Sequence, residues 1–204
     1  MGGHAGAMTG DGMAKIGPNA VTQLIAALDE SGLGQIAEPL FKTAGVFDWL
    51  EHPPEIMIDE IGVGRLHRTL RSSLPPDRAE DLMRGAGRRT ADYLLRVRIP
   101  KPAQMVLKAL PPLWSARLLV RAITSHAWTF AGSGRFSARA GNPTVFELVG
   151  NPLCAGETYA APACAWHAAV FERLFQVLVS ANCRAIETEC EARGDPRCRF
   201  ELRW

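Results

Sequence analysis

The sequence predicts an α+β fold in which helices pack on an antiparallel sheet, and three observations favour it. The first 127 residues carry apolar side chains at helical spacing, in segments separated by proline and glycine. From residue 128 the pattern changes to short β-prone runs divided by turn sequences. With 204 residues and 47% hydrophobic composition, the chain can bury one sizeable core.

The N-terminal part, residues 17–127, is predicted to be mainly helical and to follow a flexible tail at residues 1–16. Proline at helix starts and glycine or proline at helix ends give the boundaries. The expected helices cover residues 18–31, 35–44, 55–73, 76–96 and 103–127, the last of them broken at Pro111 and Pro112. After that break, Arg117 and Arg121 should share a polar face opposite Trp114, Leu118 and Ile123.

The C-terminal part, residues 128–204, is predicted to combine a sheet with one long helix, in one globular unit with residues 17–127. β-prone runs occur at Phe130, 135–139 and 144–149. A helix at about 163–180 and strands at about 183–189 and 197–204 complete the chain. Alternation along the last strand places four residues on a single buried face. They are Cys198, Phe200, Leu202 and Trp204.

Cysteines in the last third have a spacing that suggests a metal site. Cys164 begins the apolar stripe of the long helix, Cys198 lies on the buried strand face, and Glu187 and Cys190 precede a Gly-Asp-Pro turn. Three thiolates and a carboxylate are donors that Zn²⁺ accepts in tetrahedral geometry. Because Glu187 and Cys190 are three residues apart, the strand has to bend or bulge to bring them together. Four protein ligands would make the zinc structural, with no open position for substrate.

The spacing leaves other ligand sets open. Cys154 can take the place of Cys164, and His167, on the same helix face as Cys164, can take the place of Glu187. Buried cysteines without a metal are the plain alternative, because free cysteine is among the most buried residue types.

Two stretches of this sequence resemble one known family. The helix C-A-W-H-A-A-V-F and the segment I-E-T-E-C-E-A-R-G-D-P-R-C-R-F are similar to the 4-vinyl-reductase domain family, with a specific match over residues 128–204. That family occurs in bacteriochlorophyll-synthesis proteins and in aromatic-sensing domains of bacterial transcription activators. The resemblance implies zinc bound by Cys164, Glu187, Cys190 and Cys198, helices against an antiparallel sheet, and a homodimer.

The resemblance also implies a function. A reductase acting on the 4-vinyl (8-vinyl) group of a divinyl chlorophyllide needs a hydride or electron source. The sequence contains no G-x-G-x-x-G placed between a strand and a helix. We therefore expect the protein to bind a magnesium porphyrin intermediate of bacteriochlorophyll synthesis. It would deliver this tetrapyrrole to a pathway enzyme such as magnesium chelatase or the methyltransferase. Vinyl reduction and sensing of a small aromatic ligand are the alternatives.

A pocket for a flat tetrapyrrole needs apolar walls and basic groups for the propionates. The candidates are Trp114, Trp128 and Phe130 as walls, and Arg117, Arg121 and His126 as polar contacts. His67 and His126 are candidates for an axial ligand to magnesium or a proton donor. Ordinary core packing of the aromatics and a solvated helix face for the arginines explain the same residues.

Charge and hydropathy limit the other function classes. A net charge of +2 provides no field to attract nucleic acid. The N-terminus M-G-G-H-A-G-A-M-T-G-D-G-M-A-K lacks the apolar core of a secretory signal, and no apolar run approaches the roughly 20 residues that span a bilayer. We expect a cytoplasmic protein with reduced cysteines. The basic, proline-broken helices at 94–123 could still rest on the photosynthetic membrane as a peripheral contact.

Overall fold

The computed structural model describes residues 14–204 and has the predicted α+β architecture. The first part contains β1 (Lys15–Ile16), α1 (Asn19–Glu30), a 3₁₀ turn (Gly34–Ile36), α2 (Ala37–Thr43), α3 (Asp48–Glu51), β2 (Ile58–Asp59), α4 (Glu60–Ser73), α5 (Pro76–Tyr93), a π turn (Leu94–Arg98), α6 (Lys101–Ala109) and α7 (Pro112–Ser125). The second part contains α8 (Trp128–Ala131), β3 (Arg135–Arg139), β4 (Thr144–Val149), α9 (Ala165–Leu178), β5 (Arg184–Glu189), a 3₁₀ turn (Glu191–Arg193) and β6 (Cys198–Arg203).

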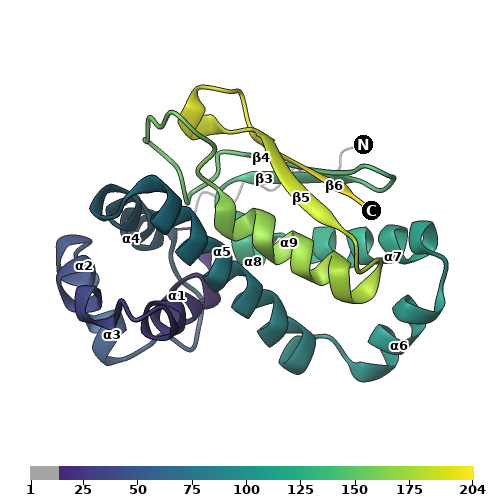
Figure 1. The fold of residues 1–204 in the computed structure, drawn as a ribbon, viewed down its shortest axis with the longest axis horizontal. Coiled ribbons are helices and arrows are strands. Elements are labelled where there is room, and N and C mark those ends of the chain that lie inside the picture. The colour runs from purple at the N-terminus through teal and green to yellow at the C-terminus, as the bar shows by residue number, and fades with distance from the viewer. Residues whose placement is uncertain (1–13) are drawn as a thin grey trace, which may run out of the picture.

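The main sheet is antiparallel, with the strand order β3-β4-β6-β5. α9 lies along one face of this sheet, and α5 crosses behind α9 (Figure 1). α1 to α4 gather at one end of α5, whereas α6 and α7 extend from its other end (Figure 1). The predicted long helix is therefore the layer between the sheet and the N-terminal helices.

Helix boundaries in the first part follow local sequence signals. The Asp59 carboxylate accepts hydrogen bonds from the Ile61 and Gly62 amides, both at 3.1 Å, and so caps α4. α5, α6 and α7 each begin with a proline in the first turn, where the missing N–H has no consequence. The break predicted at Pro111 and Pro112 is the turn between α6 and α7.

The sheet and α9 enclose an aromatic core. Phe146 on β4 pairs with Phe200 on β6, and Leu148 pairs with Cys198. Phe146 and Phe171 of α9 have ring centroids 4.6 Å apart. The buried face predicted for the last strand is confirmed, since Cys198, Phe200 and Leu202 are at most 1% exposed. The strand face that carries Cys198 thus points at the N-terminal end of α9.

Three expectations about local structure were wrong. Phe130 lies in the short helix α8 rather than in a strand, because the chain continues from α7 through one more helical turn before β3. Trp114 and Leu118 are exposed on the same side of α7 as Arg117 and Arg121, since the small residues Ser115 and Ala116 face inward instead.

The third concerns the predicted tail. Most of it, residues 1–13, lies outside the described residues. Its end does not continue as a tail, because Lys15–Ile16 forms β1 and pairs with β2, with Ile16 buried.

Candidate metal centre

Four cysteines from separate segments meet at the N-terminal end of α9. Cys154 lies in the loop after β4, Cys164 is the residue before α9, Cys190 follows β5, and Cys198 begins β6. Their sulfur atoms all lie within 4.8 Å of one another, and all four residues are buried. We call this group the four-cysteine cluster.

The spacing within the four-cysteine cluster fits a tetrahedral metal ion. The Sγ atoms of Cys164 and Cys198 are 3.4 Å apart, those of Cys154 and Cys198 are 3.6 Å apart, and those of Cys164 and Cys190 are 3.9 Å apart. Tetrahedral zinc with bonds of about 2.3 Å to sulfur requires its ligands to be about 3.8 Å apart. The cluster can therefore hold a metal ion with little movement of the chain.

Hydrogen-bond donors converge on the sulfur atoms. The Asn151 side-chain amide donates to Cys164 Sγ at 3.1 Å and to Cys198 Sγ at 3.4 Å, and the Ala163 backbone amide donates to Cys190 Sγ at 3.3 Å. Donors of this kind favour thiolates over thiols and orient the ligands of a metal. Asn151 is itself held by its side-chain oxygen, which accepts from the Leu153 amide.

The cluster is electrostatically uneven without a metal ion. Hydrogen bonding from Cys154, Cys164 and Cys198 lowers the pKa of Cys190, which is the first thiol to ionise. Hydrogen bonding with Cys154, then with Cys190 and Cys198, raises the pKa of Cys164 well above its ordinary value. A divalent cation would compensate the thiolate charges that the thiols alone cannot carry together.

Glu187 lies beside these sulfur atoms and is not one of the four donors in the cluster. Its Oε2 accepts a hydrogen bond from the Cys164 backbone amide at 2.8 Å, while Oε1 is buried without a partner. Burial, followed by the neighbouring Cys190 and Cys198, raises the pKa of this carboxyl to about 9. The expected bend is present as an irregularity of the β5–β6 ladder between Glu187 and Glu189.

The structure thus brings together three of the four predicted ligands, Cys164, Cys190 and Cys198, and adds Cys154. The predicted alternative in which Cys154 enters the site retains Cys164 as well. His167, the other alternative ligand, is not part of the four-cysteine cluster.

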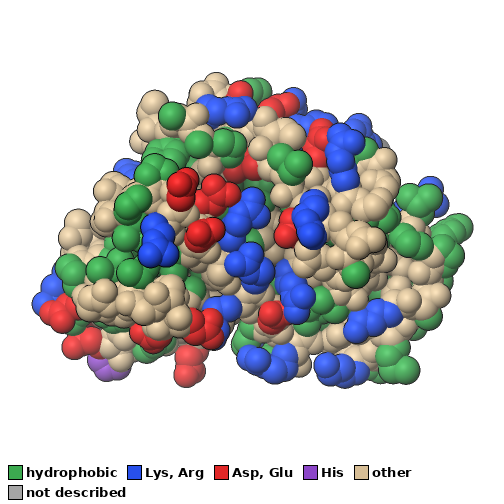
Figure 2. All heavy atoms as spheres, viewed as in Figure 1, with side chains coloured by type: hydrophobic (Ala, Val, Ile, Leu, Met, Phe, Trp, Pro, Cys, Tyr) green, Lys and Arg blue, Asp and Glu red, His purple; other side chains and the backbone are tan. Residues whose placement is uncertain are grey.

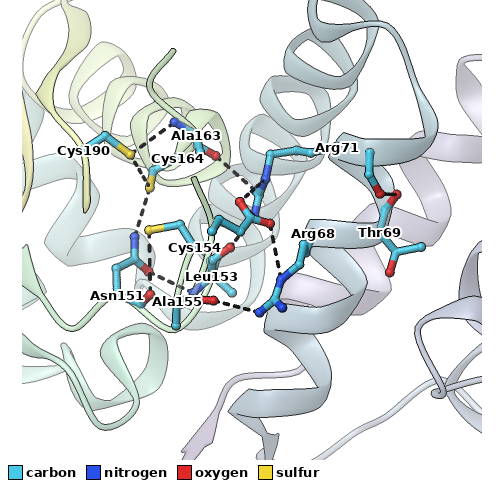
Figure 3. Close-up of polar contacts among 12 residues, drawn as sticks. Arg68, Thr69, Arg71, Asn151, Leu153, Cys154, Ala155, Ala163, Cys164 and Cys190 are labelled. Atoms are coloured by element: carbon cyan, nitrogen blue, oxygen red, sulfur yellow. Dashed lines mark hydrogen bonds and ion pairs between the residues drawn. The ribbon is translucent and has the colours of Figure 1, made fainter. Parts of the chain in front are cut away.

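A buried ion pair ties the cluster loop to the N-terminal helices. Arg71 of α4 donates to the Leu153 carbonyl at 2.5 Å and to the Ala163 carbonyl at 3.2 Å, and its Nη2 lies 2.9 Å from Glu157 Oε2. Figure 3 shows Arg71 and Arg68 reaching from α4 to the loop that carries Cys154 and Cys164. Arg71 therefore fixes both ends of this loop against α4.

Sequence reasoning missed Asn151, Arg71 and Glu157. One signal was available for Arg71. His67 and Arg71 are four residues apart on the buried side of α4, among Val63, Leu66 and Leu70. A polar pair inside an apolar helical stripe is expected to have buried partners. Asn151 and Glu157 come from an irregular loop, for which periodicity gives no signal.

A second group of buried polar side chains lies between α4 and α9. His67 and Trp166 have ring centroids 6.3 Å apart, and Trp166 and His167 have centroids 5.0 Å apart. The Nε2 atom of His67 is 3.0 Å from the Ala20 carbonyl. His67 Nδ1, Trp166 Nε1 and both ring nitrogens of His167 are buried without a hydrogen-bond partner. Buried polar atoms normally have one, so this His-Trp-His row is an exception that needs an explanation.

Both histidines of this row are neutral at physiological pH. Burial and the nearby Arg71 lower the pKa of His67 to about 3. Burial lowers the pKa of His167 to about 4, although the Phe130 backbone partly opposes this. Neutral imidazoles can ligate a metal ion or exchange hydrogen bonds with a ligand.

The six residues predicted to line a tetrapyrrole pocket do not lie around one cavity. Trp114, Arg117 and Arg121 are exposed on α7, with the Arg117 guanidinium 5.2 Å from the centroid of the Trp114 ring. His126 and Trp128 are also exposed. Phe130 is half-buried and packs edge-on against Phe136, with centroids 5.1 Å apart.

Two open clefts occur among the described residues, and both have polar linings. One of about 440 Å³ lies between α2 and α4 and includes Phe47, Trp49 and Arg65. The other, of about 580 Å³, lies beside the cluster loop and includes Glu60, Glu157 and Glu191. Neither is lined by the predicted pocket residues, and the acidic groups of the second would repel propionates.

The sequence and the fold are both similar to those of known proteins. The model of the 4-vinyl-reductase domain, abbreviated V-4-R, matches residues 144–204. Over 188 residues, the chain is 47% identical to the bacteriochlorophyll synthase 23 kDa chain of Cereibacter sphaeroides, covering 92% of this chain and 90% of that protein. It is 40% identical over 189 residues to the protein of the same name in Rhodobacter capsulatus, covering 92% and 86%.

Solved structures with the same fold are more distant in sequence. An H-NOX protein from K. algicida aligns with a TM-score of 0.60 and 8% identity, covering 92% of this chain and 96% of that one. H-NOX from T. tengcongensis gives 0.56 and 14%, with 92% and 96% covered. The phenol-responsive sensory domain of the transcription activator PoxR, with phenol, gives 0.50 and 16%, with 71% and 74% covered. At these identities the likeness is one of fold.

Helices on a four-stranded antiparallel sheet, with a four-cysteine cluster between the last helix and the final hairpin, define a protein of the 4-vinyl-reductase domain class. The extent of the sequence match is more specific than this class. The chain belongs to the family of bacteriochlorophyll synthase 23 kDa chains.

Proposed function

We propose that this protein takes part in bacteriochlorophyll synthesis by binding a magnesium tetrapyrrole intermediate and delivering it to an enzyme of the pathway. The observation that carries the proposal is the 47% identity to a bacteriochlorophyll synthase 23 kDa chain across nearly the whole of both proteins. A chain of a synthase is a component that works with others, which favours an accessory role beside a pathway enzyme. Magnesium chelatase and the methyltransferase are the candidate partners.

The fold is compatible with a flat aromatic ligand. Related H-NOX structures concern the distortion of a bound heme, and the PoxR sensory domain holds phenol. These ligands belong to those proteins, and the residues that would bind a tetrapyrrole here have to come from this chain. The tetrapyrrole reading is favoured over a phenol sensor because the bacteriochlorophyll synthase chains are far closer in sequence.

We infer that the His-Trp-His row is the polar part of the ligand site. His67 and His167 are neutral, and Trp166 lies between them with an unpartnered indole N–H. A tetrapyrrole magnesium ion accepts a neutral imidazole as an axial ligand, and an indole N–H can donate to a peripheral carbonyl. Binding there requires α4 and α9 to separate, since these side chains are buried together. Trp114, Arg117, Arg121, His126, Trp128 and Phe130 are the alternative contacts, of which the first three form an exposed aromatic and cationic group.

A titration with magnesium protoporphyrin tests the proposal. We expect a shifted Soret band at micromolar concentration with the unchanged protein, and at least a tenfold weaker affinity for His167→Phe, since one axial bond or hydrogen bond is worth about 1.4 kcal/mol or more. Phenylalanine has a similar shape and no polar atom, so the core should stay packed. The matched control is the exposed His126→Phe variant. No binding by the unchanged protein would refute the carrier role. Loss only in Trp114→Leu or Arg117→Gln would move the site to α7.

We also infer that Zn²⁺ occupies the four-cysteine cluster in a structural role, on the strength of the donor set and its spacing. A structural zinc contributes up to about 10 kcal/mol to folding in small domains. Cys190→Ser should abolish stoichiometric zinc and lower the unfolding free energy by more than about 4 kcal/mol. Cys183→Ser is the control, because Cys183 is buried outside the cluster. Zinc-free protein with unchanged stability in Cys190→Ser would rule out the metal.

Two other activities are separated by direct assays. A vinyl reductase would consume NADPH or reduced ferredoxin in the presence of a divinyl pigment, whereas a carrier would bind without turnover. A sensor would bind phenols in preference to porphyrins. The homodimer stays a prediction, and light scattering of the purified protein tests it. Delivery would take place at the photosynthetic membrane, where the pigments are used.

A further inference from the structure

The charge of the chain is distributed unevenly. Residues 94–125 contain six lysine or arginine side chains and no aspartate or glutamate, although the whole chain has a net charge of only +2. The remainder of the protein is therefore net negative. The six are Arg96, Arg98, Lys101, Lys108, Arg117 and Arg121, and all are exposed. None of them takes part in an ion pair among the described residues, so their charge is available to a partner.

The same segment exposes much of the apolar surface of the protein. Ten large hydrophobic side chains are exposed among residues 14–204, and six of these lie in the π turn, α6 and α7. They are Val97, Met105, Val106, Leu113, Trp114 and Leu118, with exposed fractions from 43% to 71%. Figure 2 shows hydrophobic side chains gathered at the end of the molecule formed by α6 and α7, with lysine and arginine side chains beside them. These six apolar and six basic residues are called the α6–α7 surface.

Internal hydrogen bonds hold this surface in shape. The Ser115 hydroxyl of α7 donates to the Leu107 carbonyl of α6 at 2.6 Å, and the Gln104 side-chain amide donates to the Ile99 carbonyl at 2.8 Å. Ser115 and Gln104 are buried, which reverses the usual distribution of polar groups inside and apolar groups outside. The polar side chains are used for internal contacts, and the apolar ones are left facing solvent.

We propose that the α6–α7 surface docks on an anionic lipid bilayer. Apolar side chains beside lysine and arginine are what an interfacial helix needs, because the former enter the headgroup boundary while the latter attract anionic lipids. Trp114, at the start of α7, can lie at the level of the headgroups. No described helix is both long enough and apolar enough to cross a bilayer, so this contact is peripheral.

Charge complementarity selects the bilayer over a second copy of the chain. Two copies meeting through this surface would bring twelve basic side chains together without an acidic one, and like charges in contact oppose association. Anionic headgroups instead supply the missing negative charge. The inference goes beyond pigment binding, and it is tested without any pigment.

Sedimentation with vesicles of phosphatidylcholine, with or without 30% phosphatidylglycerol, tests the docking. We expect the full chain to bind the anionic vesicles, to bind pure phosphatidylcholine at least tenfold more weakly, and to be released by about 0.5 M salt. Lys101→Glu with Lys108→Glu should weaken the partition coefficient by at least about tenfold. Arg78→Glu with Arg139→Glu is the charge-matched control, since both arginines are exposed outside the surface.

The apolar contribution has its own pair of variants. Met105→Gln with Leu113→Gln should weaken binding, whereas Ile56→Gln with Ile186→Gln should not, although all four residues are exposed by more than half. Circular dichroism of each variant checks that the fold is intact. Absence of binding to anionic vesicles, or equal loss in variant and control pairs, would overturn the proposal. Failure to bind porphyrin would leave it standing.

Discussion

His167 shows how a single buried side chain affects both stability and ligand binding. Its ring is fully buried between Phe130, Trp166 and Phe171, and neither nitrogen has a hydrogen-bond partner. An apolar residue of the same shape would fit this environment better. Residues that reduce stability in this way are commonly functional, which is consistent with a role in ligand binding.

The pH dependence of stability tests the state of His167. Its pKa is about 4 in the folded protein and about 6.5 when unfolded, so between these values only the unfolded chain binds the proton. Stability is therefore complete above pH 6.5 and decreases as the pH falls, by about 2 kcal/mol from pH 7 to pH 5 for this group. Chemical denaturation at the two pH values should show His167→Phe losing about 2 kcal/mol less than the unchanged protein. Equal losses would mean that His167 is solvated or paired.

Arg71 is the residue through which α4 contacts the cluster loop. Removing its charge in Arg71→Met would leave Glu157, which is 6% exposed, as an unpaired buried carboxylate. We expect a loss of about 3–5 kcal/mol in denaturant unfolding. Arg68→Met is the control, because Arg68 is half exposed and 3.7 Å from the same carboxylate, and should cost no more than about 1 kcal/mol. Similar losses in both variants would show that Arg71 acts only through packing.

At the scale of helices, the contact between α5 and α9 joins the two parts of the chain. Gly87 permits this contact, because a Cβ atom at this position would overlap the Trp166 carbonyl oxygen and crowd Ala169. Gly85, two residues earlier on α5, has open space around it. The two glycines therefore make a matched pair within one helix.

Alanine at these two positions should have opposite effects. Gly87→Ala should destabilise by about 1–3 kcal/mol, because α5 and α9 have to move apart. Gly85→Ala should stabilise by about 0.5–1 kcal/mol, since alanine is the better helix former. Thermal unfolding monitored by circular dichroism measures both. A stabilising Gly87→Ala would mean that this interface is loosely packed.

The sequence predicted these elements well where periodicity was strong. The strands at 135–139 and 144–149 and the inward face of β6 are as expected, because alternation has an unambiguous period of two. The face assignment of α7 failed because Trp114 and Leu118 were assumed to be inside, whereas the buried side is built from smaller residues. Composition alone cannot distinguish a core stripe from an apolar surface that faces solvent.

The candidate site was predictable only in part for a related reason. Cys164, Cys190 and Cys198 lie on regular elements or beside a recognisable turn, so their meeting could be inferred from spacing. Cys154 and Asn151 lie in the irregular loop after β4, whose path depends on the hydrogen bonds from Arg71 to the Leu153 and Ala163 carbonyls. Such a loop is positioned by long-range contacts, which a local pattern does not contain.

At the scale of the whole molecule, one hydrophobic cluster runs through the N-terminal helices, α9 and the sheet. The four-cysteine cluster lies at one end of α9, and the α6–α7 surface lies beyond the far end of α5 (Figure 1). Metal and membrane contacts are therefore served by different ends of one core. Removing the metal should affect these ends unequally.

Hydrogen exchange after metal removal tests this arrangement. We expect a chelator to increase exchange in residues 150–164 and in the β5–β6 hairpin, because four segments lose their common ligand. The loop should stay attached to α4 more weakly, through Arg71 and Glu157 alone. α6 and α7 should keep their protection, since the Gln104 and Ser115 hydrogen bonds that fix them are independent of the cluster. Uniform loss of protection would show instead that the metal holds the entire fold together as one cooperative unit.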